Sequence, residues 1–133
     1  MSKVLVCGGR DFKDEKLLFS TLDLFNSKNK ITLIIQGYAG KTLNKEKDII
    51  IGADRLADKW ARINNIPSTG RLFEVTNEMW NKQGKAAGFI RNKRMLLRAK
   101  PHYVIAFQGG NGTLMMVNLA LSRDIPVVKV KWT

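Results

Sequence analysis

Short apolar runs alternate with amphipathic stretches along most of this chain, and this alternation is the strongest constraint on its fold. Apolar runs that end in glycine or a turn are typical of buried strands, whereas apolar residues spaced three and four apart indicate helices. We predict strands at residues 4–7, 31–35, 71–75, 102–107 and 125–130, and helices at residues 14–27, 53–64, 84–99 and 113–123. Such alternation implies a parallel sheet with helices on both faces. We therefore expect an α/β fold, a single Rossmann-like domain over residues 1–133.

Glycine-rich loops follow three of the predicted strands, at Gly8-Gly9 and at residues 37–40 and 109–112. In an open parallel sheet, ligands bind beyond the carboxyl ends of the strands, where the strand order reverses. These loops are therefore the first candidates for a ligand site.

The segment Gly109-Gly110-Asn111-Gly112-Thr113 joins a predicted strand to a predicted helix. Glycines let the backbone approach a phosphate closely, and the free N–H groups of a helix that begins there attract the anion. Thr113 is expected to cap the helix and to donate its hydroxyl to the ligand. The alternative is a purely structural role, since tight strand-to-helix turns also favour glycine. The segment matches neither a Walker loop nor a Gly-x-Gly-x-x-Gly fingerprint.

Arg10, Asp11 and Asp54 are the polar candidates in the first half of the chain. Arg10 and Asp11 follow Gly8-Gly9, where an arginine is suited to bind a phosphate or a carboxylate. The alternative is a simple turn, with Asp11 near the start of the next helix. Asp54 opens a predicted helix, so it either stabilises the helix N-terminus by its charge or binds a ribose hydroxyl, and both interpretations stay open.

The predicted helix at 84–99 begins with two glycines, Gly84 and Gly88, which weaken a helix and indicate a close approach of another group. We expect an exposed Arg91 and its neighbour Asn92 to reach a ligand held by the glycine loops. The alternative is a solvated basic helix without a ligand.

The charge of the chain is unusually positive: 23 Lys and Arg against 11 Asp and Glu, a net charge of +12. The excess is uneven, because residues 67–133 carry 11 basic and 3 acidic side chains, and no acid lies between Glu78 and Asp124. Such asymmetry indicates a polyanionic partner, either a nucleic acid or a phosphorylated ligand. The alternative is codon usage in an AT-rich genome, which favours lysine and asparagine.

Other classes of site are poorly supported by the composition. One cysteine, Cys7, and one histidine, His102, provide neither an intramolecular disulfide, nor a metal cage, nor a catalytic triad. No apolar run approaches the roughly 20 residues that a membrane span needs. We therefore predict no metal, no cofactor, no membrane contact and a cytoplasmic location.

Five short motifs follow one another along the chain in an order that is typical of one family. They are Gly8-Gly9-Arg10-Asp11-Phe12, Gly52-Ala53-Asp54, Gly84-Lys85-Ala86-Ala87-Gly88, Arg91-Asn92-Lys93-Arg94-Met95 and Gly109-Gly110-Asn111-Gly112-Thr113. Over nearly the whole chain this pattern resembles the YspA or cpYpsA-related SLOG family, Rossmann-like domains related to DprA and the Lonely Guy enzymes. The resemblance implies a nucleotide or nucleotide-derived ligand at the glycine loops, self-association into homo-oligomers, and frequent occurrence in phages and prophages.

Two departures from the related enzymes bear on function. In Lonely Guy enzymes a Pro-Gly-Gly-x-Gly-Thr loop is followed by glutamates that serve phosphoribohydrolase chemistry, whereas here Gln108 replaces the proline and Leu114, Met115 and Met116 follow Thr113. We therefore expect binding rather than catalysis. The polar, lysine-rich segment 38–51 also looks like an insertion, expected as a mobile excursion that serves as a lid or a contact.

Three functions are consistent with these sequence features. The first is a sensor or sequestering protein for a nucleotide-like ligand. Such a protein would be encoded by a phage or prophage and would act on nucleotide-signalled defence. The second is a nucleotide-processing enzyme such as a nucleoside-monophosphate N-glycosidase, with Asp11 or Asp54 in place of the missing glutamate. The third is DprA-like nucleic-acid binding. The candidate ligand-binding residues are Gly8, Gly9, Arg10, Asp11, Asp54, Arg91, Asn92, Gly109, Gly110, Asn111, Gly112 and Thr113.

Overall fold

The computed structural model describes residues 1–131, and their order of elements is the predicted strand–helix alternation with one predicted strand missing and three elements added. The additions are a two-stranded hairpin (β3 and β4) and a short helix (α3). None of the helices within this range has the length and apolar character needed to cross a membrane. The elements are β1 (Ser2–Cys7), α1 (Glu15–Lys28), β2 (Ile31–Ile35), β3 (Lys41–Asn44), β4 (Ile49–Ile51), α2 (Ala53–Ile63), α3 (Asn77–Gln83), α4 (Ala86–Ala99), β5 (Tyr103–Phe107), α5 (Asn111–Ser122) and β6 (Val127–Val130).

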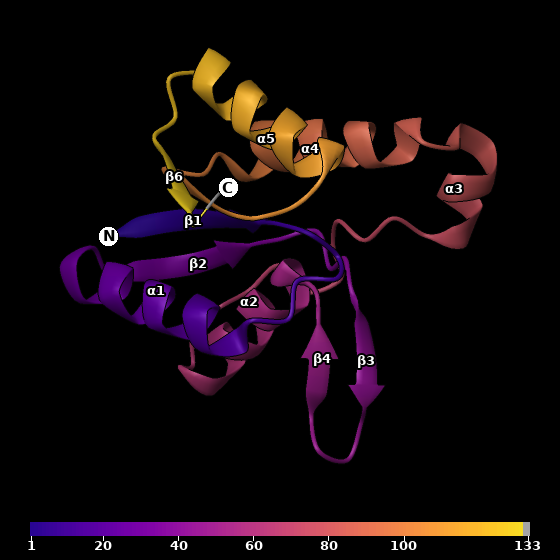
Figure 1. The fold of residues 1–133 in the computed structure, drawn as a ribbon. Helices are drawn as coiled ribbons and strands as arrows, with labels where there is room; N and C mark the ends of the chain where they lie inside the picture. Colours follow the sequence, from indigo (N-terminus) through magenta and orange to yellow (C-terminus); the bar gives the residue numbers. More distant parts are fainter. Residues whose placement is uncertain (132–133) are drawn as a thin grey trace.

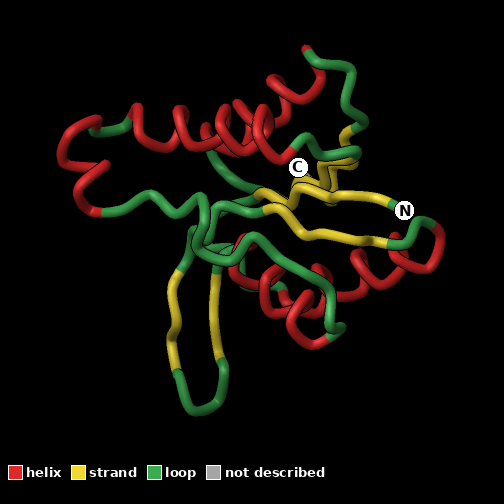
Figure 2. Tube along the Cα trace, turned by 180° about the vertical axis from the view of Figure 1, so that it is seen from behind, coloured by secondary structure: helices red, strands yellow, loops and turns green. Residues whose placement is uncertain are grey.

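The main sheet is parallel and has the order β2-β1-β5-β6. Leu5 of β1 lies opposite Ile35 of β2 on one side and Val104 of β5 on the other. The chain runs from β1 outward to β2 and then returns to the opposite side of β1 to form β5 and β6 (Figure 2). The strand order therefore reverses between β1 and β5.

Helices cover both faces of the sheet, as predicted (Figure 1). Successive side chains of a strand point to opposite faces. Val4 and Val6 of β1 accordingly join the core beneath α1 and α2, whereas Leu5 and Cys7 join the core beneath α4 and α5. Trp60 of α2 is the largest fully buried side chain, and its indole Nε1–H donates a hydrogen bond to Asp23 of α1 at 2.9 Å. The sequence alternation thus gives a Rossmann-like α/β domain with two apolar layers.

The strand predicted at residues 71–75 is absent, and this prediction was wrong. The chain does run beside β2, but earlier: the Ile34 N–H donates to Pro67 and the Thr69 N–H donates to Ile34, at 2.9 and 3.0 Å. Gly70 then adopts a positive φ of 56° and turns the chain away from the sheet edge. Phe73 is buried in the core beneath α4 and α5, which accounts for the apolar pattern without a strand.

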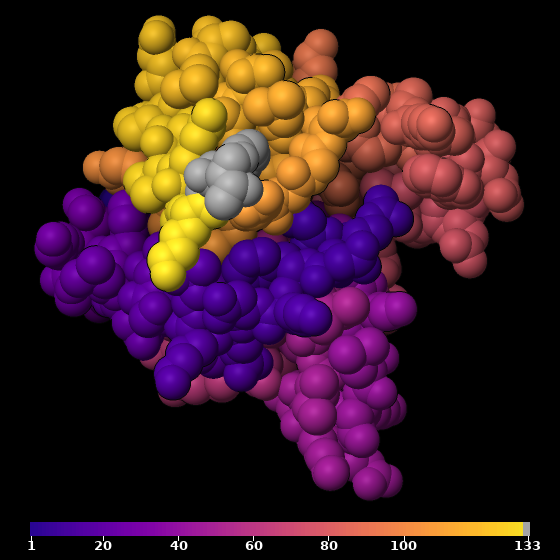
Figure 3. Space-filling model, in the orientation of Figure 1, coloured from indigo at the N-terminus to yellow at the C-terminus, as the bar shows by residue number. Residues whose placement is uncertain are grey.

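The segment expected as an irregular excursion forms an antiparallel hairpin of β3 and β4. The hairpin extends away from the main sheet on the side of α2 (Figure 1), and it stands out from the molecular surface (Figure 3). All four residues of β3 are exposed, whereas Ile50 of β4 packs against the core beneath α1 and α2. The hairpin is therefore seated on the domain along one strand only.

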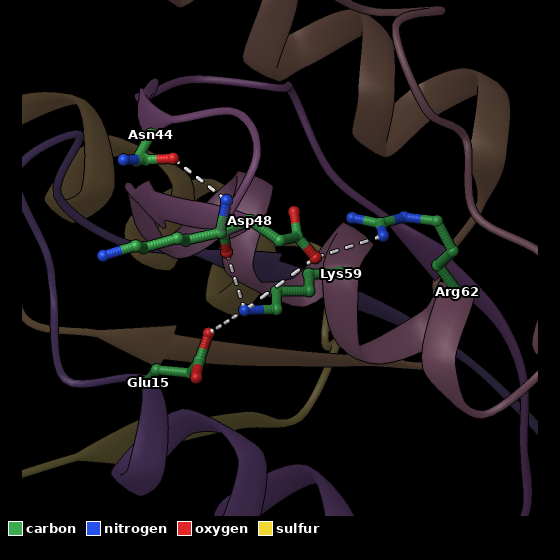
Figure 4. A network of polar contacts seen from close by, with 6 residues as sticks. Glu15, Asn44, Asp48, Lys59 and Arg62 are labelled. Atoms are coloured by element: carbon green, nitrogen blue, oxygen red, sulfur yellow. Dashed lines mark hydrogen bonds and ion pairs between the residues drawn. The ribbon is translucent and has the colours of Figure 1, made fainter.

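Lys59 of α2 connects the hairpin to two helices (Figure 4). Its Nζ donates to Glu15 Oε1 at 2.7 Å and to the backbone oxygen of Asp48 at 2.9 Å, while only 14% of its side chain is exposed. Arg62 adds a second contact to the Asp48 carboxylate at 3.4 Å. These charge-assisted bonds fix the hairpin turn against α1 and α2.

Replacing Lys59 with methionine is expected to release the hairpin, because methionine keeps the length and apolar stem but removes the donor. We expect the free energy of unfolding to fall by about 1–2 kcal/mol. Hydrogen exchange should accelerate at the amides of residues 41–51 and stay unchanged in β1. Lys47→Met, at an exposed hairpin lysine, is the matched control. Equal exchange in both variants would contradict the anchoring role.

Candidate functional site

A cavity of about 640 Å³ opens at the carboxyl ends of β1 and β5, where the strand order reverses. This is the position at which open α/β sheets bind ligands. The twelve residues singled out from the sequence all line it, although they come from four separate stretches of chain. They are Gly8, Gly9, Arg10, Asp11, Asp54, Arg91, Asn92, Gly109, Gly110, Asn111, Gly112 and Thr113.

The loop after β1 packs against α2 and against the loop after β5, and glycine is required at both contacts. A Cβ added at Gly8 would lie 2.6 Å from the Cβ of Ala53 in α2, and one added at Gly109 would lie 2.7 Å from the backbone nitrogen of Gly9. The Gly9 N–H donates to the oxygen of Gln108 at 3.0 Å. Gly8 and Gly109 are therefore explained by packing of the fold, whereas an added Cβ at Gly9 would lie 3.2 Å from the Gln108 oxygen, a tight but less severe contact.

Gly110 and Gly112 have no such packing role, because a Cβ at either position would meet nothing within 4 Å. Both line the cavity, at the first turn of α5. The first N–H groups of a helix lack intrahelical acceptors and carry the positive end of its dipole. Helix α5 thus begins at the cavity wall, and Gly110 and Gly112 add no side chain there that would hinder approach to its first backbone N–H groups.

Thr113 does not cap this helix, and that prediction was wrong. Helix α5 begins two residues earlier than predicted, at Asn111, with Gly110 at the N-cap and no side-chain capping bond. Thr113 is buried instead, close to Gly109. The two added residues, Asn111 and Gly112, belong to the glycine loop and adopt helical geometry.

Arg91 and Asn92 of α4 join three parts of the site. The Arg91 guanidinium donates to the backbone oxygen of Gly37 and to Asn92 Oδ1, both at 2.8 Å. The Asn92 amide donates in turn to the backbone oxygen of Gly112 at 3.1 Å. Arg91 was expected to be exposed, but it is partly buried, because these bonds draw it inward between β2 and α4. Asn92, which is buried, positions both Arg91 and the α5 loop.

Arg10 and Asp11 are exposed at the rim of the cavity, in the loop that follows β1. Asp11 lies four residues before α1, whose N-cap is Asp14: the Asp14 side chain accepts the Leu17 N–H at 3.0 Å. The rim therefore places one positive and one negative side chain in reach of solvent and of the cavity together.

Asp54 is a buried carboxylate in the wall of this cavity. It accepts the Ala39 N–H at 3.1 Å and a second backbone hydrogen bond from Gly37. Burial raises the pKa of Asp54 to about 6, because desolvation outweighs the opposing effects of Arg91, the two backbone bonds and Arg10. Burial likewise lowers the pKa of Arg91, while Asp54 opposes that shift. The pair brings a titratable acid and a guanidinium into one cavity.

Five residues of the cavity wall escaped the sequence predictions: Cys7, Phe12, Ala39, Met95 and Gln108. Ala39 lies within the glycine-rich segment 37–40 that follows a predicted strand, and this position could have identified it as a cavity residue. Cys7 is buried, and burial raises the pKa of its thiol, so it stays protonated. Within residues 1–131 no group of three or more His, Cys, Asp or Glu side chains is placed to hold a metal.

This fold and this cavity define a Rossmann-like domain with its candidate ligand site at the topological switch point. A profile of the YspA, cpYpsA-related SLOG family matches residues 2–72. The Gene 61 protein of Mycobacterium phage D29 is 31% identical over 136 residues, which cover 96% of this chain and 95% of that protein. The chain therefore belongs to the YspA, cpYpsA-related SLOG family. Arg91 and the loop at 109–112 lie beyond the segment that the profile matches.

Arg91→Ala is expected to lower the free energy of unfolding by about 1–3 kcal/mol, because it leaves the Gly37 oxygen and Asn92 without their donor. An exposed arginine would have had little effect. Arg98→Ala, at an exposed position on the same helix, is the control and should change stability by less than about 0.5 kcal/mol. Urea denaturation measures both, and equal stabilities would contradict the bridging role.

Asp54 should make stability fall as pH rises. Its pKa is about 6 in the folded chain against 3.8 in the reference state, so the folded state holds the proton more tightly between these values. The free energy of unfolding should therefore decline between about pH 4 and 6, by at most about 3 kcal/mol. Asp54→Asn removes this slope. Urea titrations of both proteins from pH 4 to 7 test it, and parallel pH profiles would refute it.

Proposed function

We propose that this protein binds a nucleotide or nucleotide-derived ligand, with a phosphate on the loop Gly109–Gly112. The observation that carries the proposal is the position of Gly110 and Gly112. Both lie at the start of α5 with open space where a side chain would stand, although the fold does not require glycine there. Close backbone approach and the helix dipole are the means by which such loops bind phosphate.

Two arginines support an anionic ligand. Arg10 stands at the rim and Arg91 in the wall of the same cavity, and the guanidinium geometry suits bidentate phosphate recognition. Arg91 donates hydrogen bonds to the Gly37 oxygen and to Asn92 Oδ1, and these two bonds fix the orientation of its remaining N–H groups. Thr113 and Asn111 complete the proposed phosphate subsite, and Asp54 is proposed to face the sugar.

Family membership supports a nucleotide-related role, since SLOG domains are associated with nucleotide binding or processing. The relative from Mycobacterium phage D29 is compatible with a phage or prophage origin. We propose that the protein acts as a sensor or sequestering protein for a nucleotide signal, as one domain that self-associates. The Lonely Guy glutamates are absent after Thr113, where Leu114, Met115 and Met116 stand instead.

A second candidate function rests on Asp54. A buried carboxyl group with a pKa near 6 is suited to general acid–base chemistry near neutral pH. In that case the protein would hydrolyse a nucleoside monophosphate at its N-glycosidic bond. Base release from AMP that is lost in Asp54→Ala would establish this activity, whereas binding without release would leave the sensor role.

A thermal-shift panel tests the primary proposal. Purified protein is heated with AMP, ADP, ADP-ribose, NAD⁺, cyclic nucleotides or a short single-stranded DNA, each at low and moderate salt. A ligand at about 100 times its dissociation constant adds roughly 2.7 kcal/mol, which is several degrees for a chain of this size. A salt-tolerant shift with a nucleotide supports the proposal. A shift with DNA alone that disappears as salt rises would replace it by nucleic-acid binding.

Two substitutions locate the phosphate. Gly110→Val places a side chain in the open space before α5, and Arg10→Ala removes an exposed charge. Each should weaken nucleotide binding by about ten-fold or more while the ligand-free protein melts within a few degrees of the wild type. Arg98→Ala removes the same charge outside the cavity and should bind normally. Normal binding by both site variants would refute this assignment.

A further inference from the structure

A second cavity of about 410 Å³ lies beside the first and shares part of its wall. Arg10, Ala39 and Arg91 line both cavities. The two spaces therefore adjoin along these three residues. The other walls of the second cavity come from the loop after β2, from α3 with the residues before it, and from the start of α4.

Trp80 of α3 lines this second cavity, and the fold does not account for it. Helix α3 contains no buried residue, and 48% of the Trp80 surface is exposed. Figure 1 shows α3 away from the sheet, beyond the start of α4. A large aromatic side chain left half exposed in a concave wall is typical of a ligand contact, because a flat ring stacks on it.

Gly88 lies in the same wall, within α4. An added Cβ there would meet nothing within 4 Å, so no neighbour requires glycine. A glycine inside a helix costs about 0.5–1 kcal/mol relative to alanine. The missing side chain widens the cavity that Trp80 lines.

Tyr38 forms a fixed wall of this cavity. The Arg55 guanidinium lies over its ring at 4.3 Å from the centroid and that of Arg71 at 5.2 Å, and Arg55 Nε also donates to the backbone oxygen of Tyr38 at 3.2 Å. Cation–π attraction therefore holds the ring, and the hydrogen bond holds the backbone beside it. The cavity thus has a second aromatic wall beside Trp80. Three arginines, Arg10, Arg55 and Arg91, line it against one carboxylate, Glu74, and this excess of positive charge favours a phosphate-linked ligand.

We infer that the ligand carries two ring systems joined through phosphates, a dinucleotide-type molecule, and that its second ring binds beside Trp80. The inference rests on the proposed function. The first cavity has its own phosphate loop and its own apolar wall in Phe12 and Met95, so it holds one nucleotide half. The linking phosphates then lie at Arg10 and Arg91, where the cavities meet, and the second cavity receives the other half.

Calorimetric titration with one-ring and two-ring probes tests this inference. The probes are AMP, NAD⁺ and diadenosine diphosphate. We expect at least one two-ring probe to bind the wild type about ten-fold more tightly than AMP. Trp80→Ala should reduce that affinity roughly 5- to 100-fold, the range of base–aromatic stacking, and leave AMP within about two-fold. Trp80→Phe should retain most of the binding.

Two further variants separate a ligand contact from a structural effect. Gly88→Leu fills the second cavity from the opposite element and should cause the same selective loss. Phe89→Ala removes a ring of similar exposure, 45%, that lines neither cavity, and it should bind both probes normally. Two-ring probes that bind no tighter than AMP, or a Trp80→Ala variant that loses AMP equally, would overturn the inference while the proposed function stands. No binding of any probe would overturn both.

Discussion

The contact between the loops after β1 and β5 is the constraint on which the rest of the site depends. The two strands are neighbours at the centre of the sheet, and their loops meet through the hydrogen bond from Gly9 to Gln108. There is no room for a side chain on Gly109 at this contact, nor on Gly8, which packs against Ala53 of α2. The close approach brings the start of α5 next to the loop that carries Arg10, and the hydrogen bond from Asn92 to Gly112 ties the start of α5 to α4. One steric requirement thus sets the positions of three of the cavity walls.

Most of the fold and the composition of the cavity could be predicted because both follow from periodicity and from glycine at strand ends. The twelve residues singled out converge because parallel strands end at the same edge of a sheet. The failures have local physical causes. A positive φ at Gly70 diverts a segment whose apolar residues look like a strand, and α3 buries nothing, so it leaves no amphipathic pattern. The depth of Arg91 depends on a backbone oxygen 54 residues away, which no local pattern reveals.

Several features of the cavity reduce stability without serving the fold. Asp54 is buried at a cost that its two backbone bonds and the nearby arginines only partly offset. Gly88 weakens α4. Gly110 occupies the N-cap of α5 and offers it no capping side chain, and Gly112 adds a second glycine to its first turn. Structure that disfavours folding tends to persist at functional sites. The hairpin shows the opposite arrangement, since Lys59 is nearly buried to hold it against α1 and α2.

The location of Asp54 also has a consequence for the thermodynamics of binding. An anion placed among Arg10, Arg91 and the amides of α5 would lie close to a carboxyl group that already titrates near pH 6. The added negative charge would raise that pKa further, so complex formation near neutrality would take up a proton from the solvent. The observed enthalpy would then depend on the ionisation heat of the buffer, and affinity would increase as the medium becomes more acidic. The buried acid would make the site a proton-coupled receptor for its ligand.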